Sequence, residues 1–106
     1  MMDINTIKRL CKAEAMRWSN HIMHRLHQRK VSMDDVISAV MNSELIEEYL
    51  DDYPYPSCLL MGLDAKGCPI HVVCGIAPTE LRMITVYRPD PAEWSHDFKT
   101  RKECQT

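Results

Sequence analysis

The chain has 106 residues, of which 45% are hydrophobic and 26% are charged, and its formal net charge at pH 7 is -2. This composition is typical of one soluble globular domain, here residues 1–106, and the mildly acidic charge excludes strong nonspecific nucleic-acid binding through overall charge. No apolar run approaches the roughly 18 residues of a membrane span, and the start lacks the apolar region of a signal peptide, so we expect a cytoplasmic protein without membrane contact.

The first predicted element is one long amphipathic helix. Its apolar residues recur at steps of three and four from Ile4 to Leu26, and neither Gly nor Pro interrupts them. His21, Arg25 and Arg29 are spaced by four residues, which would place them along one flank of this helix.

A shorter second helix and an edge strand are predicted next. Ser32 is a good N-cap, and Asp35 stands where its side chain can complete a capping box. Residues 44–50 resemble a strand, and the acidic residues from 47 to 52 indicate an edge position, where charge discourages stray pairing. The Tyr-Pro-Tyr-Pro run at residues 53–56 predicts a rigid, extended corner.

Three short apolar runs then predict an antiparallel meander, because a four-residue turn signal separates each run from the next. The runs are residues 57–63, 69–76 and 81–88. One face of this sheet is expected to pack on the helices. The other face is less polar than a solvated face, so the C-terminal segment, a partner or both should cover it. A last helix at residues 92–99 would dock Trp94 and Phe98 on the sheet.

The register of the meander stays open. If both turns are symmetric, His71 of the middle run lies opposite Leu60 and Val86. A slip of one residue in the last strand would instead place Thr85 and Tyr87 beside His71. In either case we expect an α+β domain, in which two N-terminal helices pack on a largely antiparallel four-stranded sheet with a C-terminal helix.

The cysteines and the missing motifs restrict the chemistry. The five cysteines are odd in number, are scattered and form no C-x-x-C pair, which predicts free thiols rather than a zinc site or a disulfide framework. Phosphate-binding loops, dinucleotide fingerprints and nucleophile elbows are absent. We therefore expect no metal and no cofactor.

The remaining candidates are His, Arg and Tyr, a set that suits metal-free RNA cleavage. This reaction needs a base, an acid and cations that hold the phosphate. We predict His71, His21 and Tyr87 as catalytic residues and Arg25, Arg29 and Arg88 as phosphate-binding residues. All but Arg88 have a structural alternative: His71 as a hydrogen-bonded strand residue, Tyr87 as packing, and the basic residues of the first helix as a solvated flank.

Three stretches carry a resemblance to a known family. They are PYPSCLLMG at 54–62, PIHVV at 69–73, and ITVYRPDP at 84–91 followed by Trp94 and Phe98. Together with the His21-x-x-x-Arg25-x-x-x-Arg29 pattern, they closely resemble the domain of unknown function 4258 family. That family is similar to the RelE/ParE-like and BrnT-like toxins of bacterial toxin–antitoxin pairs, small α+β proteins of which many are metal-free ribonucleases.

The resemblance implies a RelE-like fold and a toxin-like endoribonuclease acting on messenger RNA. It also implies a cognate antitoxin-like partner of the zinc-finger or helix-turn-helix type. The main alternative is a non-catalytic interaction module that binds a protein partner or itself through an apolar sheet face. A toxin of another target class, such as a gyrase inhibitor, is a third reading, and self-association also stays open.

Overall fold

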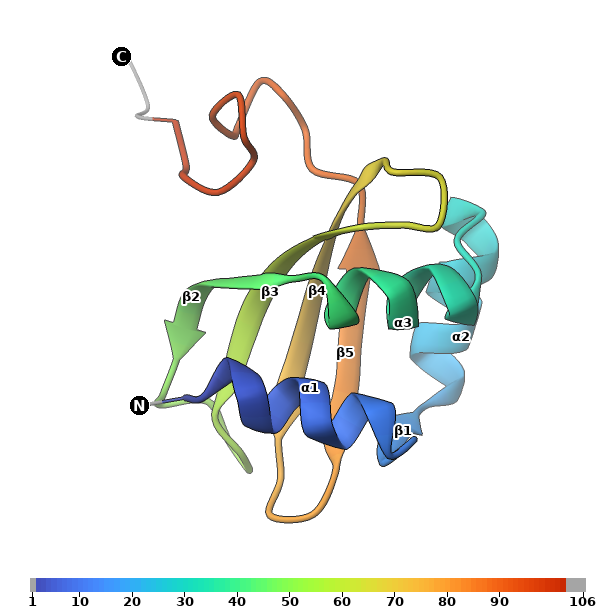
Figure 1. Ribbon diagram of the computed structural model, residues 1–106, viewed down its shortest axis with the longest axis vertical. Helices are drawn as coiled ribbons and strands as arrows, with labels where there is room; N and C mark the ends of the chain where they lie inside the picture. Colours follow the sequence, from blue (N-terminus) through green and yellow to red (C-terminus); the bar gives the residue numbers. More distant parts are fainter. Residues whose placement is uncertain (1, 103–106) are drawn as a thin grey trace.

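The computed structural model describes residues 2–102 as an α+β domain with three helices on one face of a five-stranded sheet (Figure 1). The strands lie in the order β1-β5-β4-β3-β2, and all neighbours are antiparallel except β1 and β5. The helices are α1 (Ile4–Lys12), α2 (Asn20–Arg29) and α3 (Met33–Met41). The strands are β1 (Met16–Trp18), β2 (Glu44–Tyr49), β3 (Ser57–Leu63), β4 (Pro69–Ile76) and β5 (Leu81–Tyr87).

The prediction of one long N-terminal helix is wrong, because the chain leaves the helix after Lys12. Glu14 adopts a left-handed conformation with φ of 60°, and Ala15 then offers its carbonyl to the N–H of Leu81 at 2.8 Å. This bond begins the parallel pairing of β1 with β5, which adds a fifth strand to the predicted four. The second half restarts as α2, whose N-cap is Ser19. The apolar period continues across the break because both helices cover the same core.

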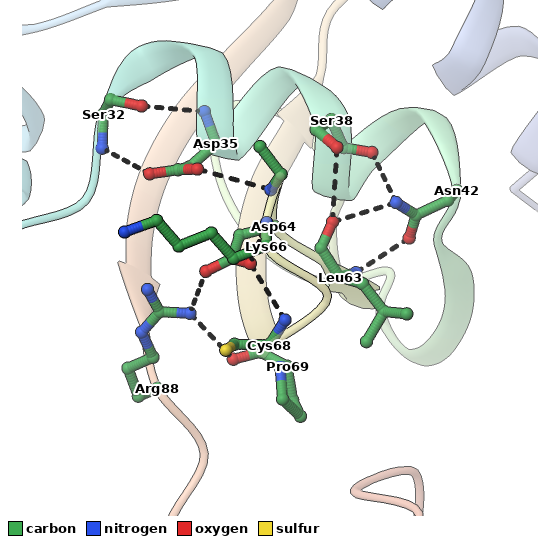
Figure 2. Close-up of polar contacts among 11 residues, drawn as sticks. Ser32, Asp35, Ser38, Asn42, Leu63, Asp64, Lys66, Cys68, Pro69 and Arg88 are labelled. Carbon is green, nitrogen blue, oxygen red and sulfur yellow. Dashed lines mark hydrogen bonds and ion pairs between the residues drawn. The ribbon is translucent and has the colours of Figure 1, made fainter.

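The predicted cap of α3 is confirmed. The side chain of Ser32 accepts a hydrogen bond from the N–H of Asp35 at 3.0 Å, and the carboxylate of Asp35 accepts one from the N–H of Ser32 at 3.1 Å (Figure 2). At the other end of α3, the side-chain amide of Asn42 both donates to and accepts from the backbone of Leu63 (Figure 2). The helix is therefore tied to the end of β3.

The symmetric register is wrong, and the alternative that places Tyr87 beside His71 is confirmed. His71 lies opposite Met61 on β3 and opposite Tyr87 on β5. The turn after Leu63 has five residues before Pro69, one more than the symmetric hairpin assumed. On the other side, a bulge at Ile84 shifts the last part of β5 by one residue. The sheet therefore places an imidazole next to a phenol.

The helices and one face of the sheet form a single core, and α3 lies very close to β3. Buried residues of the strands, such as Leu60, Val72 and Val86, belong to the same cluster as Ile22 and Val36 of the helices. A Cβ on Gly62 of β3 would lie 2.0 Å from the carbonyl oxygen of Ala39 in α3. Only glycine permits this approach.

The predicted C-terminal helix is wrong, because residues 90–102 form a loop that folds back on itself (the C-terminal loop; orange to red in Figure 1). Trp94 pairs with Arg101 in an antiparallel bridge, and the N–H of Ser95 donates to the carbonyl of Thr100 at 2.8 Å. The carboxylate of Asp97 binds the Ser95 hydroxyl and the Lys99 N–H, which gives the backbone local alternatives to helical bonds. As predicted, the C-terminal segment covers part of the second sheet face, and Trp94 is buried there.

Candidate functional site

His71 lies at the centre of the sheet face that the helices leave free, and its side chain is fully buried. Its Nε2 lies 2.8 Å from the carbonyl oxygen of Phe98, and its Nδ1 lies 3.2 Å from the hydroxyl of Tyr87. A carbonyl only accepts, so Nε2 carries the proton and Nδ1 accepts from the phenol. The ring of Trp94 stands edge-on to the imidazole, with a centroid distance of 4.4 Å. Both ring nitrogens therefore have protein partners.

The surroundings of His71 keep it neutral. Burial lowers its pKa below the ordinary 6.5, and Arg101 adds to this, while the Phe98 carbonyl and Glu47 act in the opposite direction. Burial also raises the pKa of Tyr87. A general acid or base must reach the proton that it transfers. In this arrangement the imidazole instead links the sheet to the C-terminal loop.

A charged group lies next to this histidine and was missed in the sequence. Arg101 donates two hydrogen bonds to the carboxylate of Glu47, at 2.8 and 3.0 Å, and its guanidinium lies 4.8 Å from the ring centroid of Trp94. The Tyr49 hydroxyl donates to the same carboxylate at 2.6 Å. The bonds from Arg101 lower the pKa of Glu47, and burial together with the bond to Glu47 raises the pKa of Tyr49 to about 12. In the sequence, the acidic residues of the predicted edge strand and the basic residues near the C-terminus were the signal that could have predicted this ion pair.

The predicted residues on α2 lie on the helix side of the sheet. His21 is exposed, and Arg25 is half-buried. Arg29 donates to the carbonyl of Val86 and, at 3.3 Å, to the hydroxyl of Thr85. Because β1 pairs only with residues 81–83 of β5, this guanidinium caps a part of β5 that has a neighbouring strand, β4, on one side only.

Arg88 is held at the turn between β3 and β4. Its Nη1 lies 2.7 Å from the carboxylate of Asp64 and 3.3 Å from the carbonyl of Pro69 (Figure 2). The same carboxylate accepts the N–H groups of Lys66 and Cys68, and the bond from Cys68 is the main reason why the pKa of Asp64 is lowered. Arg88 therefore fastens the turn to the end of β5.

The six predicted site residues thus occupy three separate places. His71 and Tyr87 touch each other beneath the C-terminal loop, whereas the α2 residues and Arg88 lie elsewhere. None of the six lines any of five cavities found among residues 2–102. The structure does not assemble them into one pocket.

An open depression lies at the other end of the same sheet face, beside the Tyr-Pro-Tyr-Pro corner. It has a volume of about 230 Å³. Tyr53 is 94% exposed and Ile84, the bulge residue, is 44% exposed. The guanidinium of Arg82 lies 5.0 Å from the ring centroid of Tyr55. We call Tyr53, Tyr55, Arg82 and Ile84 the Tyr53 surface.

Arg82 has an incomplete set of partners in this surface. Its Nε is buried and has no hydrogen-bond partner among the described residues. The nearest carboxylate oxygen, on Glu80, is 3.8 Å away and also lies 2.7 Å from Nε of Arg17. A further acceptor would satisfy this N–H.

The structure also bears on the metal ligands and thiols of the chain. In the part of the chain that the structure covers, no group of three or more His, Cys, Asp or Glu side chains could hold a metal ion. Cys11, Cys58, Cys68 and Cys74 are free thiols, as predicted, and Cys104 lies outside the described residues. The Sγ atoms of Cys58 and Cys74 are 3.8 Å apart in the core, and their contact and burial raise the pKa of Cys74.

Among residues 2–102, no helix combines the length and apolar character needed to cross a bilayer.

Comparison with known proteins places the fold in a family. The family model described as "Domain of unknown function (DUF4258)" matches residues 18–88. The chain belongs to the DUF4258 family. The match runs from the last residue of β1 to the residue after β5, so α1 and the C-terminal loop lie outside it. No curated protein and no solved structure matches the chain. For this DUF4258 protein, the resemblance to RelE/ParE-like and BrnT-like toxins stays a prediction.

Proposed function

We propose that this DUF4258 protein is a protein-binding module whose contact surface is the Tyr53 surface. The observation that carries the proposal is the exposure of Tyr53, at 94%, beside the exposed Ile84. Neighbouring prolines restrict the backbone at this corner, so less freedom would be lost when a partner binds. Tyr and Arg dominate interface hot spots because they offer large contact area and several kinds of contact.

Arg82 and the adjacent depression support the same proposal. The contact with the Tyr55 ring holds the guanidinium in place. The Arg82 side chain is 42% exposed, so its guanidinium can meet an acceptor of a bound protein. A depression of about 230 Å³ has room for one side chain of a partner.

The resemblance to toxin–antitoxin proteins suggests which partner to test first. It predicts a cognate antitoxin-like protein of the zinc-finger or helix-turn-helix type, encoded next to this gene. A second copy of the chain is the other occupant to test. In both cases the Tyr53 surface would lie at the centre of the interface.

The test is a titration of the purified chain with the product of the neighbouring gene, followed by calorimetry. Tyr53→Ala should weaken binding at least tenfold, which is the size expected for a hot-spot residue. Leu50→Ala is the control, because Leu50 is 56% exposed but lies outside the surface. Unchanged affinity for Tyr53→Ala would reject the proposal, and light scattering of the chain alone tests self-association.

A metal-free endoribonuclease is the second candidate, and the contact between His71 and Tyr87 favours it. Both residues would need to become accessible before they could act on RNA. The test is expression of wild type and Tyr87→Phe, with and without the neighbouring gene product, while growth and messenger RNA integrity are followed. Equal growth and intact RNA in all cultures would eliminate this candidate.

A further inference from the structure

The C-terminal loop is held on the sheet by contacts with three residues, which we call the acidic socket: Glu44, Glu47 and His71. Arg101 binds Glu47 through two hydrogen bonds, and Lys99 binds Glu44 at 3.0 Å. His71 receives the edge of Trp94, which is 2% exposed, and donates to the Phe98 carbonyl. The socket therefore recognises two cations, one indole and one carbonyl.

The loop presents these groups as a compact unit with its own hydrogen bonds. The N–H of Ser95 bonds to Thr100, and the N–H of Lys102 bonds to the carbonyl of Glu93 at 2.9 Å. The bridge between them places Arg101 directly opposite Trp94. What the socket binds is a short hairpin with an aromatic and a basic side chain at paired positions.

The ion pairs of the attachment are largely exposed, and its buried contacts are those of Trp94 and His71. The side chains of Lys99 and Glu44 are 36% and 62% exposed, and that of Arg101 is 61% exposed. Exposed ion pairs of this kind contribute about 0–1 kcal/mol each. Peripheral segments with few buried contacts open at lower free energy than the core.

The charge of the vacated face decides which ligand it would attract. Without the loop, Glu44 and Glu47 would lose their cations and leave two carboxylates on this face. An acidic surface repels an RNA backbone and attracts a cationic segment. The exposed imidazole and apolar strand residues would accept an aromatic ring.

We propose that the acidic socket is a docking site for a basic protein segment that carries an aromatic side chain, and that the C-terminal loop is its intramolecular occupant. The loop competes with such a segment at the high effective concentration of a tethered ligand, about millimolar. This site is separate from the Tyr53 surface and does not depend on the function proposed for that surface.

The experiment uses the full chain and a labelled peptide with the sequence of residues 90–102. In the variant Trp94→Ala/Arg101→Ala the tethered loop loses its two main contacts. Fluorescence anisotropy should show at least tenfold tighter peptide binding to this variant than to wild type. Adding Glu47→Gln to the variant should weaken peptide binding at least fivefold, and a peptide that lacks the tryptophan should also bind less.

The controls separate this site from the other proposals. Tyr53→Ala should leave peptide binding unchanged, whereas it should weaken the partner complex. Equal peptide affinity for wild type and variant would overturn the proposal. An affinity of the variant that does not change when Glu47→Gln is added would overturn it too. So would a variant that prefers a labelled single-stranded RNA to the peptide.

A measurement on wild type covers the case in which the variant does not fold. In hydrogen exchange, the amides of residues 93–102 should exchange before those of β4, and faster at high salt because exposed ion pairs are screened. Exchange of the loop and β4 at one common rate would show that the loop does not open separately, and would reject the proposed competition.

Discussion

His71 donates a hydrogen bond from Nε2 to the carbonyl oxygen of Phe98 at 2.8 Å, which joins the centre of the sheet to the C-terminal loop. The imidazole is fully buried, and its other nitrogen accepts from Tyr87. In the sequence this histidine was the leading catalytic candidate. In the fold it has the environment of a structural residue, and the first predictions test that role.

His71→Ala should lower the free energy of unfolding by about 2–4 kcal/mol. The substitution removes a buried ring and leaves the Phe98 carbonyl without its donor. Urea denaturation measures the loss. His21→Ala is the control, because His21 is exposed and should change stability by less than about 0.5 kcal/mol. If both substitutions change the free energy of unfolding by similarly small amounts, His71 does not have the structural role that its contacts indicate.

Stability should fall when the pH falls below about 6.5, the ordinary pKa of histidine. Burial lowers the pKa of His71 in the folded state, so below pH 6.5 the unfolded chain binds a proton that the folded chain does not. The contribution of His71 is therefore present above that pH and is lost as acid is added. Urea midpoints at pH 7.5 and 5.5 measure this, and His71→Gln should show a smaller difference than wild type.

Arg29→Ala should destabilise the domain by about 1 kcal/mol, since it removes a charged donor from the carbonyl of Val86. Arg25→Ala, one helical turn earlier, is the matched control and should have less effect. Hydrogen exchange should also be faster at the end of β5 in Arg29→Ala. If both substitutions leave stability unchanged, the prediction is wrong, and both arginines belong to a solvated helix flank, as the helix pattern suggested.

Gly62→Ala should be much more destabilising than Gly75→Ala, although both glycines lie in neighbouring central strands. The new Cβ at Gly62 would lie 2.0 Å from a backbone oxygen of α3, so helix and sheet would have to separate. At Gly75 the nearest atom is 3.7 Å away, an ordinary contact. We expect a loss of about 2 kcal/mol or more at Gly62, measured as a shift of the urea midpoint. Comparable midpoints for the two variants would contradict the close approach of α3 and β3.

Interactions between residues near in sequence were readable from the chain alone. Ser32 and Asp35 stand three residues apart, so their side chains and backbone meet whatever the rest of the fold does. The apolar runs that became β3, β4 and β5 were delimited by their own turn residues. The spacing of Ile22 and Leu26 likewise identified the buried side of α2.

The site depended on contacts between distant residues, which no local pattern encodes. The left-handed turn at Glu14 is stabilised by the pairing of β1 with β5, and the bulge at Ile84 decides that Tyr87, and not Val86, lies opposite His71. Residues 92–99 have a helical spacing of aromatics, yet Lys99 and the nearby Arg101 bind the acidic edge strand instead. By itself the sequence determined the short helix α3, the strands β2 to β5 and the apolar side of the helices, because these follow from neighbours along the chain. Only the tertiary structure decided whether the histidines and arginines share a pocket, because that depends on register and on which segment covers each sheet face.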